Sequence, residues 1–149
     1  LTRIDGTVTT PLAGADRVGL MLAFGKAAAV MRPETLFAGF GVRDTIVVQP
    51  GDVSPDRHEL QHGCFDHDRL VALAQTLPTK VAEIKHQTGS RELVIAAAMP
   101  KTLAVALGMG LARQGVRFFA GTYFLNWEES TRSFVPVRTH PSQSSTFPS

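Results

Sequence analysis

The sequence predicts an α/β fold in which a mostly parallel sheet carries helices on both faces and ends in a β-hairpin. Short apolar runs alternate with helical patterns along the chain, which is typical of buried strands joined by crossover helices. The clearest unit is the apolar run Leu93–Ala98, which is followed by Pro100 in the first turn of an apolar helix. A length of 149 residues and a hydrophobic content of 44% fit one globular domain with its own core.

Four apolar runs are predicted to form the parallel sheet, and two more are predicted to form the hairpin. Charged residues, Gly or Pro bound these runs, as expected at strand ends. The parallel strands are Val18–Phe24, Thr45–Gln49, Leu93–Ala98 and Val116–Ala120, and the hairpin strands are Tyr123–Trp127 and Ser133–Val137. Residues 26–43 have no clean period, and their fold is left open.

Two helices are predicted between the strands. In Leu70–Ile84, apolar residues recur every three or four positions, and Pro78 inside this helix is expected to kink it or divide it. The second helix, Leu103–Ala112, is apolar on all sides and contains Gly108 and Gly110. Each Gly in a helix interior lowers the stability of the helix by about 1 kcal/mol relative to Ala. The presence of both glycines therefore predicts that this helix packs closely against a strand or another helix.

The chain is predicted to hold one α/β domain at residues 17–138. An extended lead-in or linker precedes it at residues 1–16, and a Ser- and Pro-rich tail at 139–149 is expected to be disordered. Cys64 is the only cysteine, so no internal disulfide is possible and a cytoplasmic location is expected. The sequence contains neither a membrane-spanning run nor a signal segment. A net charge of +2 argues against binding to duplex nucleic acid.

The turn Met99-Pro100-Lys101-Thr102 is the first candidate for ligand binding. It lies at the carboxyl end of a strand, where ligands bind in open α/β sheets, and it begins a helix whose amides attract anions. Lys101 adds a charge and Thr102 a hydroxyl. The alternative is an ordinary connection between strand and helix with a solvated Lys101.

Gly25-Lys26 is a second basic turn, at the end of the first predicted parallel strand. The two turns either form one site for an anionic ligand or present two unrelated surface lysines. Tyr123 is a further candidate for the pocket, although a place in the core is the favoured role for Tyr123 and for Trp127 when each is taken singly. The nucleotide motifs G-x-G-x-x-G and G-x-x-x-x-G-K-[ST] are absent. The predicted ligand-binding residues are Gly25, Lys26, Met99, Pro100, Lys101, Thr102 and Tyr123.

The polar stretch Asp52–His67 invites comparison with a zinc site. Its possible ligands are His58, His62, Cys64 and His67. Because their spacing is irregular and no Cys-x-x-Cys pair is present, a solvated loop is favoured and no metal is predicted. No recognisable signature surrounds Cys64 as a nucleophile, and no catalytic residue or cofactor is predicted.

Three parts of the second half of the chain form one pattern: Glu92-Leu-Val-Ile-Ala-Ala-Ala-Met-Pro-Lys-Thr-Leu-Ala-Val-Ala-Leu-Gly108, the apolar run Val116–Ala120 and the hairpin end Phe134-Val-Pro-Val137. This pattern resembles the carboxyl-terminal half of SAVED domains, and the resemblance covers roughly residues 67 to 137. In that family the strand often begins His-Leu-Phe, where this chain has Leu93-Val94-Ile95. SAVED domains are cyclic-oligonucleotide sensors of bacterial anti-phage (CBASS) systems, built from two Rossmann-like units related to CARF domains.

The resemblance therefore implies a Rossmann-like, CARF-like sensor that binds a cyclic oligonucleotide and activates or assembles an antiviral effector. Complete sensors of this family are longer, so the chain is expected to be a detached or truncated sensor or a subunit of a split one. Its partners would be an effector on another chain and, on ligand binding, further copies of itself. Two other functions stay open: a small Rossmann-like enzyme that acts on a phosphorylated metabolite through Lys101, His58 or His62, and a protein–protein interaction module.

Overall fold

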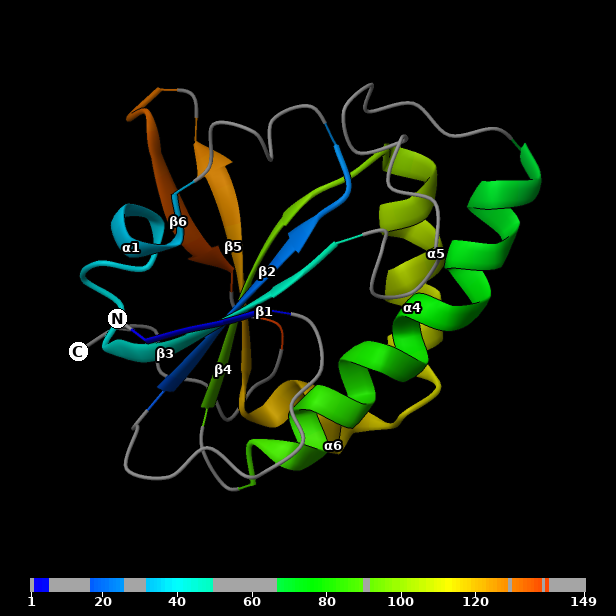
Figure 1. Ribbon diagram of the computed structural model, residues 1–149, viewed down its shortest axis with the longest axis horizontal. Helices are drawn as coiled ribbons and strands as arrows, with labels where there is room; N and C mark the ends of the chain where they lie inside the picture. Colours follow the sequence, from blue (N-terminus) through cyan, green and yellow to red (C-terminus); the bar gives the residue numbers. More distant parts are fainter. Residues whose placement is uncertain are drawn as a thin grey trace.

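The computed structural model describes residues 2–5, 17–25, 32–49, 67–89, 92–128, 130–137 and 139, and they form a three-layer α/β fold. A six-stranded sheet has the order β1-β3-β2-β4-β5-β6. Helix α1 lies on one face, and α4, α5 and α6 lie on the other (Figure 1). The elements are β1 (Thr2–Asp5), β2 (Arg17–Ala23), α1 (Pro33–Leu36), β3 (Val42–Val48), α4 (His67–Gln87), β4 (Glu92–Ala98), α5 (Lys101–Ala112), α6 (Val116–Ala120), β5 (Thr122–Glu128) and β6 (Ser133–Val137).

The predicted fold class is confirmed: the sheet is parallel from β1 to β5, and β6 closes it as the antiparallel strand of a hairpin. Side chains alternate between the two faces of the central strands. One set packs against α4 and α5 and includes Leu20, Leu22 and Ile95, and the other set packs against α1 and includes Met21, Val47 and Val94. This alternation explains why the central strands read as continuous apolar runs in the sequence.

The prediction of a strand at Val116–Ala120 is wrong, because these residues form the short helix α6. Gly115 has φ 91°, a conformation that favours Gly, and it lets the chain begin a new helical turn after α5. Phe118 then packs into the core, and the Thr122 hydroxyl donates to its carbonyl oxygen. The parallel neighbour of β4 is β5, which was predicted only as a hairpin strand. β5 therefore pairs with β4 on one side and with β6 on the other.

The predicted lead-in at residues 1–16 includes a strand of the sheet. Thr2–Asp5 form β1, which pairs in parallel with β3 at the edge of the sheet, with Thr2 opposite Asp44. The amino-terminal segment is therefore part of the fold and not only a linker. Apart from residue 139, the tail predicted to be disordered lies outside the described residues.

Pro78 was predicted to kink or divide this helix, and the division is wrong, because α4 runs as one helix through Pro78. The buried Pro78 ring packs against α5, where an ideal Cβ placed on Gly110 would lie 2.6 Å from Pro78 Cβ. The close contact predicted for the α5 glycines therefore exists at Gly110. It is absent at Gly108, which is exposed and has no atom within 4 Å of such a Cβ.

The order of the strands reverses between β2 and β4. From β2 the chain passes to β3 on one side, then returns to β4 on the other side of β2 and continues to β5. The fold is thus Rossmann-like, and the carboxyl ends of β2 and β4 form its topological switch point, which is where α/β proteins of this kind bind ligands. No helix within the described ranges is both long and apolar enough to cross a membrane.

Candidate functional site

The turns that follow β2 and β4 lie side by side at the switch point. Phe24 N donates to Ala98 O at 2.7 Å. An ideal Cβ on Gly25 would lie 3.4 Å from Met99 N, an ordinary van der Waals distance, so the two turns are in contact. The structure therefore brings the predicted Gly25 turn to the Met99 turn. Lys26, the other predicted residue of the first turn, lies outside the described residues.

Helix α5 begins directly at this edge of the sheet. Pro100 is its N-cap residue, with φ −59° and ψ 146°, and it has no side-chain group that accepts a hydrogen bond. The first helical bond runs from Ala104 N to Pro100 O at 3.0 Å, and the first turn contains no acidic residue. Lys101 and Thr102 are both exposed there. The first turn of α5 therefore carries free main-chain amides, a lysine and a threonine, and negative charge is favoured at such a helix N-terminus.

The structure does not place Tyr123 at this site. Tyr123 is opposite Val94 in the register of β4 and β5, whereas the turn follows Ala98. At about 3.3 Å per residue, the two positions are separated by roughly 16 Å along the sheet. The position of Tyr123 relative to the turn depends on the register between β4 and β5, and the sequence of β5 alone does not determine that register.

Tyr123 belongs to a polar cluster at the opposite, amino-terminal edge of the sheet. Arg17 Nε donates to Glu92 Oε1 at 3.0 Å, and Arg17 Nη1 donates to Phe40 O at 3.0 Å. Burial raises the pKa of the Tyr123 hydroxyl, a hydrogen bond to Glu92 and the charge of Glu92 raise it further, and Arg17 opposes them. The cluster joins β2, β4 and β5 to the segment after α1, which indicates a structural role.

Lys85 of α4 also lies near Glu92. Its Nζ donates to Gly121 O at 3.0 Å. Burial lowers the pKa of the Lys85 ammonium, and the charge of Glu92 partly offsets that change. The two lysines therefore lie in different surroundings: Lys85 bonds α4 to the turn before β5, and Lys101 is exposed at the start of α5.

The raised pKa of Tyr123 predicts a loss of stability at alkaline pH. Above pH 10.0 an unfolded tyrosine loses its proton while the native one keeps it, so the unfolded state binds fewer protons and unfolding becomes easier as pH rises. Tyr123 is the only tyrosine, so its near-ultraviolet absorbance reports the native pKa directly. We expect a midpoint above 10.0. A Tyr123→Phe variant should lose less stability than wild type over the same range, and a midpoint below that of free tyrosine would contradict the assignment.

The polar stretch considered as a metal site is not described by the structure. His58, His62 and Cys64 lie outside the described residues, and the helix α4 begins at His67. Among the described residues, no group of three or more His, Cys, Asp or Glu side chains lies close enough together to hold a metal ion.

Trp127 is a residue of the carboxyl edge that sequence reasoning missed. Tyr123, Leu125 and Trp127 alternate on one face of β5, and the first two are buried, whereas Trp127 is 46% exposed. A place in the core is therefore wrong for Trp127. The sequence does contain a sign of this exposure. Trp127 is the last residue of the apolar face of β5, and the end of a strand can extend beyond the core that buries its start.

Neither a scan against protein-family models nor a search of curated proteins finds a match to this chain.

Proposed function

We propose that this chain is a ligand-sensing domain that binds a cyclic oligonucleotide second messenger at the carboxyl ends of β2 and β4. The main support is the coincidence of two independent features at one place. The strand order reverses between β2 and β4, and α5 begins there with Lys101 and Thr102 exposed. A topological switch point predicts where a ligand binds, and a helix N-terminus with a lysine predicts that the ligand is an anion.

The class of anion follows from the resemblance of residues 67–137 to SAVED domains. A cyclic oligonucleotide presents phosphodiester groups, and each can accept hydrogen bonds from main-chain amides while its charge is balanced by a lysine. One phosphodiester would lie at the first turn of α5, in contact with Lys101. Gly25 lies beside this turn, since an ideal Cβ on it would be in van der Waals contact with the main chain of Ala98 and Met99.

The proposal includes an effector on another chain and contacts between copies on ligand binding. The outer face of α5 offers a surface for such contacts, since Val105 is 64% exposed and Met109 is 63% exposed. Ligand and partner would then be held by the same helix, the ligand at its first turn and the partner along its length. This arrangement links occupancy of the site to assembly.

Lys101→Ala tests the proposed site. Loss of one charge-assisted hydrogen bond should weaken binding of a cyclic oligonucleotide about 10- to 150-fold. The melting temperature of the free protein should stay nearly unchanged, because Lys101 is exposed. Raising the salt concentration should weaken wild type more than the variant, since one phosphate contact is already missing. Titration calorimetry against cyclic di- and trinucleotides at two salt concentrations measures both effects.

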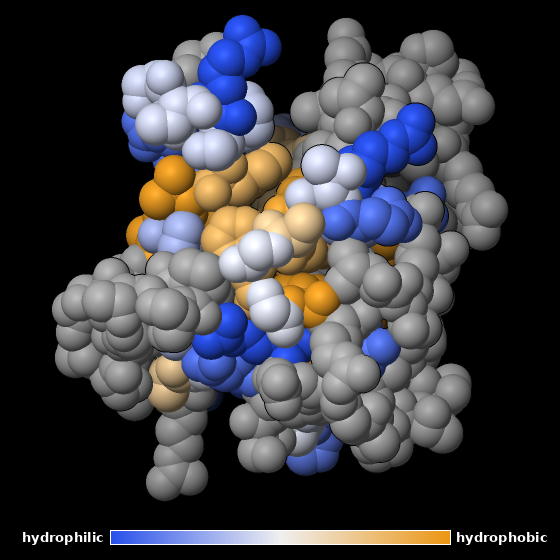
Figure 2. Space-filling view, turned by 90° about the vertical axis from the view of Figure 1, so that its left-hand side faces the viewer, coloured by the Kyte–Doolittle hydropathy of each residue, from blue (hydrophilic) through white to orange (hydrophobic). Residues whose placement is uncertain are grey.

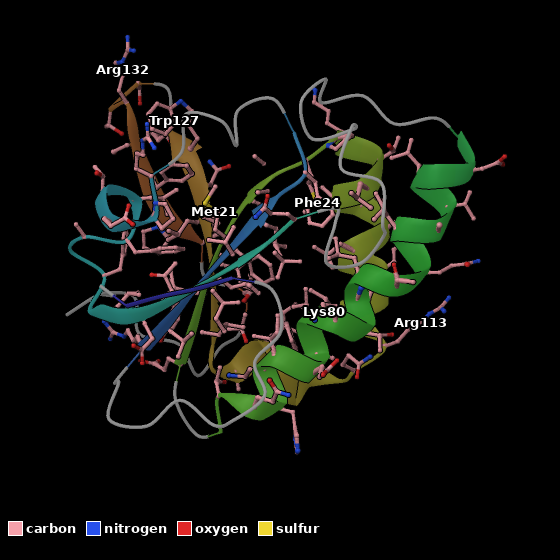
Figure 3. All side chains as sticks on the ribbon, in the orientation of Figure 1. Met21, Phe24, Lys80, Arg113, Trp127 and Arg132 are labelled. Atoms are coloured by element: carbon pink, nitrogen blue, oxygen red, sulfur yellow. The ribbon has the colours of Figure 1, made fainter. Side chains whose placement is uncertain are left out.

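Arg113→Ala is the matched control. Arg113 is exposed just past the other end of α5, about 18 Å from Lys101 at 1.5 Å per residue, and its side chain points away from the sheet (Figure 3). Both variants remove one positive charge, so an effect of net charge alone would appear in each. Equal losses of affinity in the two variants would place the ligand elsewhere, and failure of wild type to bind any cyclic oligonucleotide would refute the proposal.

A further inference from the structure

Most of the exposed large hydrophobic side chains lie on the side of the sheet that carries α4, α5 and α6. Among the described residues, these side chains are Val71, Val105, Met109, Trp127, Val135 and Val137. Trp127 is the exception, because its partner in β6, Phe134, packs against the core on the α1 side. Figure 2 shows the α1 side, on which apolar residues lie between hydrophilic groups. The exposed apolar side chains are therefore concentrated on the α5 side.

The outer face of α5 is an apolar helix face that no described element covers. The buried leucines of α5 face the core, whereas Val105 and Met109 are 64% and 63% exposed. From Leu103 to Ala112 the helix has no charged residue. A surface helix usually has charged and polar residues on its outer face. The composition of α5 is therefore that of a helix with a second apolar surface against it.

The β5–β6 hairpin presents an apolar sheet face that lacks a helix. Val135 and Val137 of β6 are opposite Asn126 and Phe124, so they share the face on which Phe124 packs against the α5-side core. Val135 is 38% exposed and Val137 is 43% exposed. Phe119 of α6 meets Phe124 at the lower end of this face, with ring centroids 6.3 Å apart. Figure 1 shows the rest of the hairpin standing clear of α4 and α5, which cover the central strands.

We propose that two copies of this chain associate through these two faces, with α5 of each copy lying over the β5–β6 hairpin of the other. The inference rests on the proposed function for its role, because it specifies the contact between copies which that function includes. Each copy offers a helix face without a sheet and a sheet face without a helix, and both are on the same side of the molecule. A twofold contact covers both faces in both copies, so the assembly closes as a dimer.

A second copy fits these faces better than a foreign helix does. A foreign helix on the hairpin would leave the outer face of α5 uncovered, whereas a second copy covers both. No like charges meet, since β6 and the stretch of α5 from Leu103 to Ala112 have no charged residue. The helix is about 18 Å long and about 10 Å wide, and the two strands add about 10 Å to the width. Two such surfaces bury on the order of 1,000 Å² in total, which is the size of a weak, concentration-dependent interface.

Opposite charges placed on the two faces test this contact. Val105→Glu on α5 and Val135→Lys on β6 should each raise the dissociation constant of the dimer at least about 10-fold, because the symmetric contact buries each unpaired charge twice. In the double variant each glutamate lies near a lysine of the other copy, so the dissociation constant should return to within about 3-fold of wild type. Sedimentation equilibrium of the full chain over a range of concentrations measures these constants.

Val71→Glu is the matched control. It makes the same exchange at an exposed valine of α4, which packs against α5 through Pro78 and Gly110 and does not adjoin the hairpin. The dissociation constant of this variant should equal that of wild type. Thermal melting of each variant shows that it is folded. Equal weakening of the dimer by Val71→Glu and Val105→Glu would refute the proposed contact, because the added charge alone would then account for the effect.

The remaining outcomes separate this inference from the proposed function. A loss in Val105→Glu without a loss in Val135→Lys would mean that α5 meets α5, and it would refute the contact with the hairpin. If wild type stays monomeric up to about 1 mM, with and without a cyclic oligonucleotide that calorimetry shows to bind, the dimer is refuted and sensing stands. If the dimer forms as described but wild type binds no cyclic oligonucleotide, sensing is refuted and the contact stands.

Discussion

Replacing Phe37 by Ala is expected to lower the free energy of unfolding by about 3–5 kcal/mol, the usual cost of deleting a buried aromatic ring. Phe37 is fully buried at the end of α1, and it packs with Met21 and Val47. Among the described residues, α1 and the turn after it are the helical cover of this face of the sheet, so few neighbours can move to fill the space. Urea unfolding of the two proteins measures the loss.

A second substitution shows whether the ring is responsible. An ideal Cβ on Gly19 would lie 2.8 Å from the Phe37 ring, so Gly19→Ala alone should destabilise the wild type by about 1–3 kcal/mol. In the Phe37→Ala protein the same methyl group enters an empty space, and its effect should be neutral or favourable. A double-mutant cycle isolates this change of sign. Additive effects of the two substitutions would mean that Phe37 does not lie over Gly19.

Gly110→Ala and Gly108→Ala are expected to change stability in opposite directions, although both place the same residue in the same helix. At Gly110 the added Cβ would meet the rigid Pro78 ring of α4, so the helices must separate, at a cost of about 1–3 kcal/mol. At Gly108 the Cβ enters open space, and Ala should stabilise the helix by about 0.5–1 kcal/mol.

Thermal melting of both variants tests the packing of α4 against α5. The comparison is controlled for helix propensity, since each variant gains the same Ala, and the difference between them reports the contact alone. A Pro78→Ala background should reduce the penalty of Gly110→Ala by removing the ring it meets. Similar melting temperatures for the two single variants would place Pro78 away from Gly110.

Most of the strands could be predicted from the sequence because their ends are marked locally. The predicted strand Leu93–Ala98 differs from β4 by one residue at its start, and the predicted Ser133–Val137 agrees with β6. The run Val116–Ala120 could not be assigned in this way. An apolar run of five residues fits a strand and a helical turn equally well. Here the run forms a helix, which places Phe118 in the core directly after α5.

The candidate site was predictable where it depends on rules for parallel sheets and not where it depends on register. Carboxyl ends of parallel strands share an edge, so the turns at Gly25 and Met99 could be expected on the same side of the molecule. Their direct contact also requires β2 and β4 to be neighbours, which follows from packing of the whole chain. The sequence made Tyr123, and not Trp127, a candidate for the site, and the pairing of Tyr123 with Val94 places Tyr123 far from the turn after Ala98.

The hairpin also determines what the edge of the sheet at β6 offers to a further strand. Gly121 O faces β4, so the main-chain groups of odd-numbered residues of β5 face β4 and those of even-numbered residues face β6. Leu125 and its partner Pro136 therefore exchange no main-chain hydrogen bonds. The main chain of Pro136 therefore faces the free edge of β6. A further strand added at that edge could bond to the Pro136 carbonyl, but Pro136 has no N–H to donate. Growth of the sheet by addition of a foreign strand is thereby discouraged at β6, which guards against aggregation along this edge.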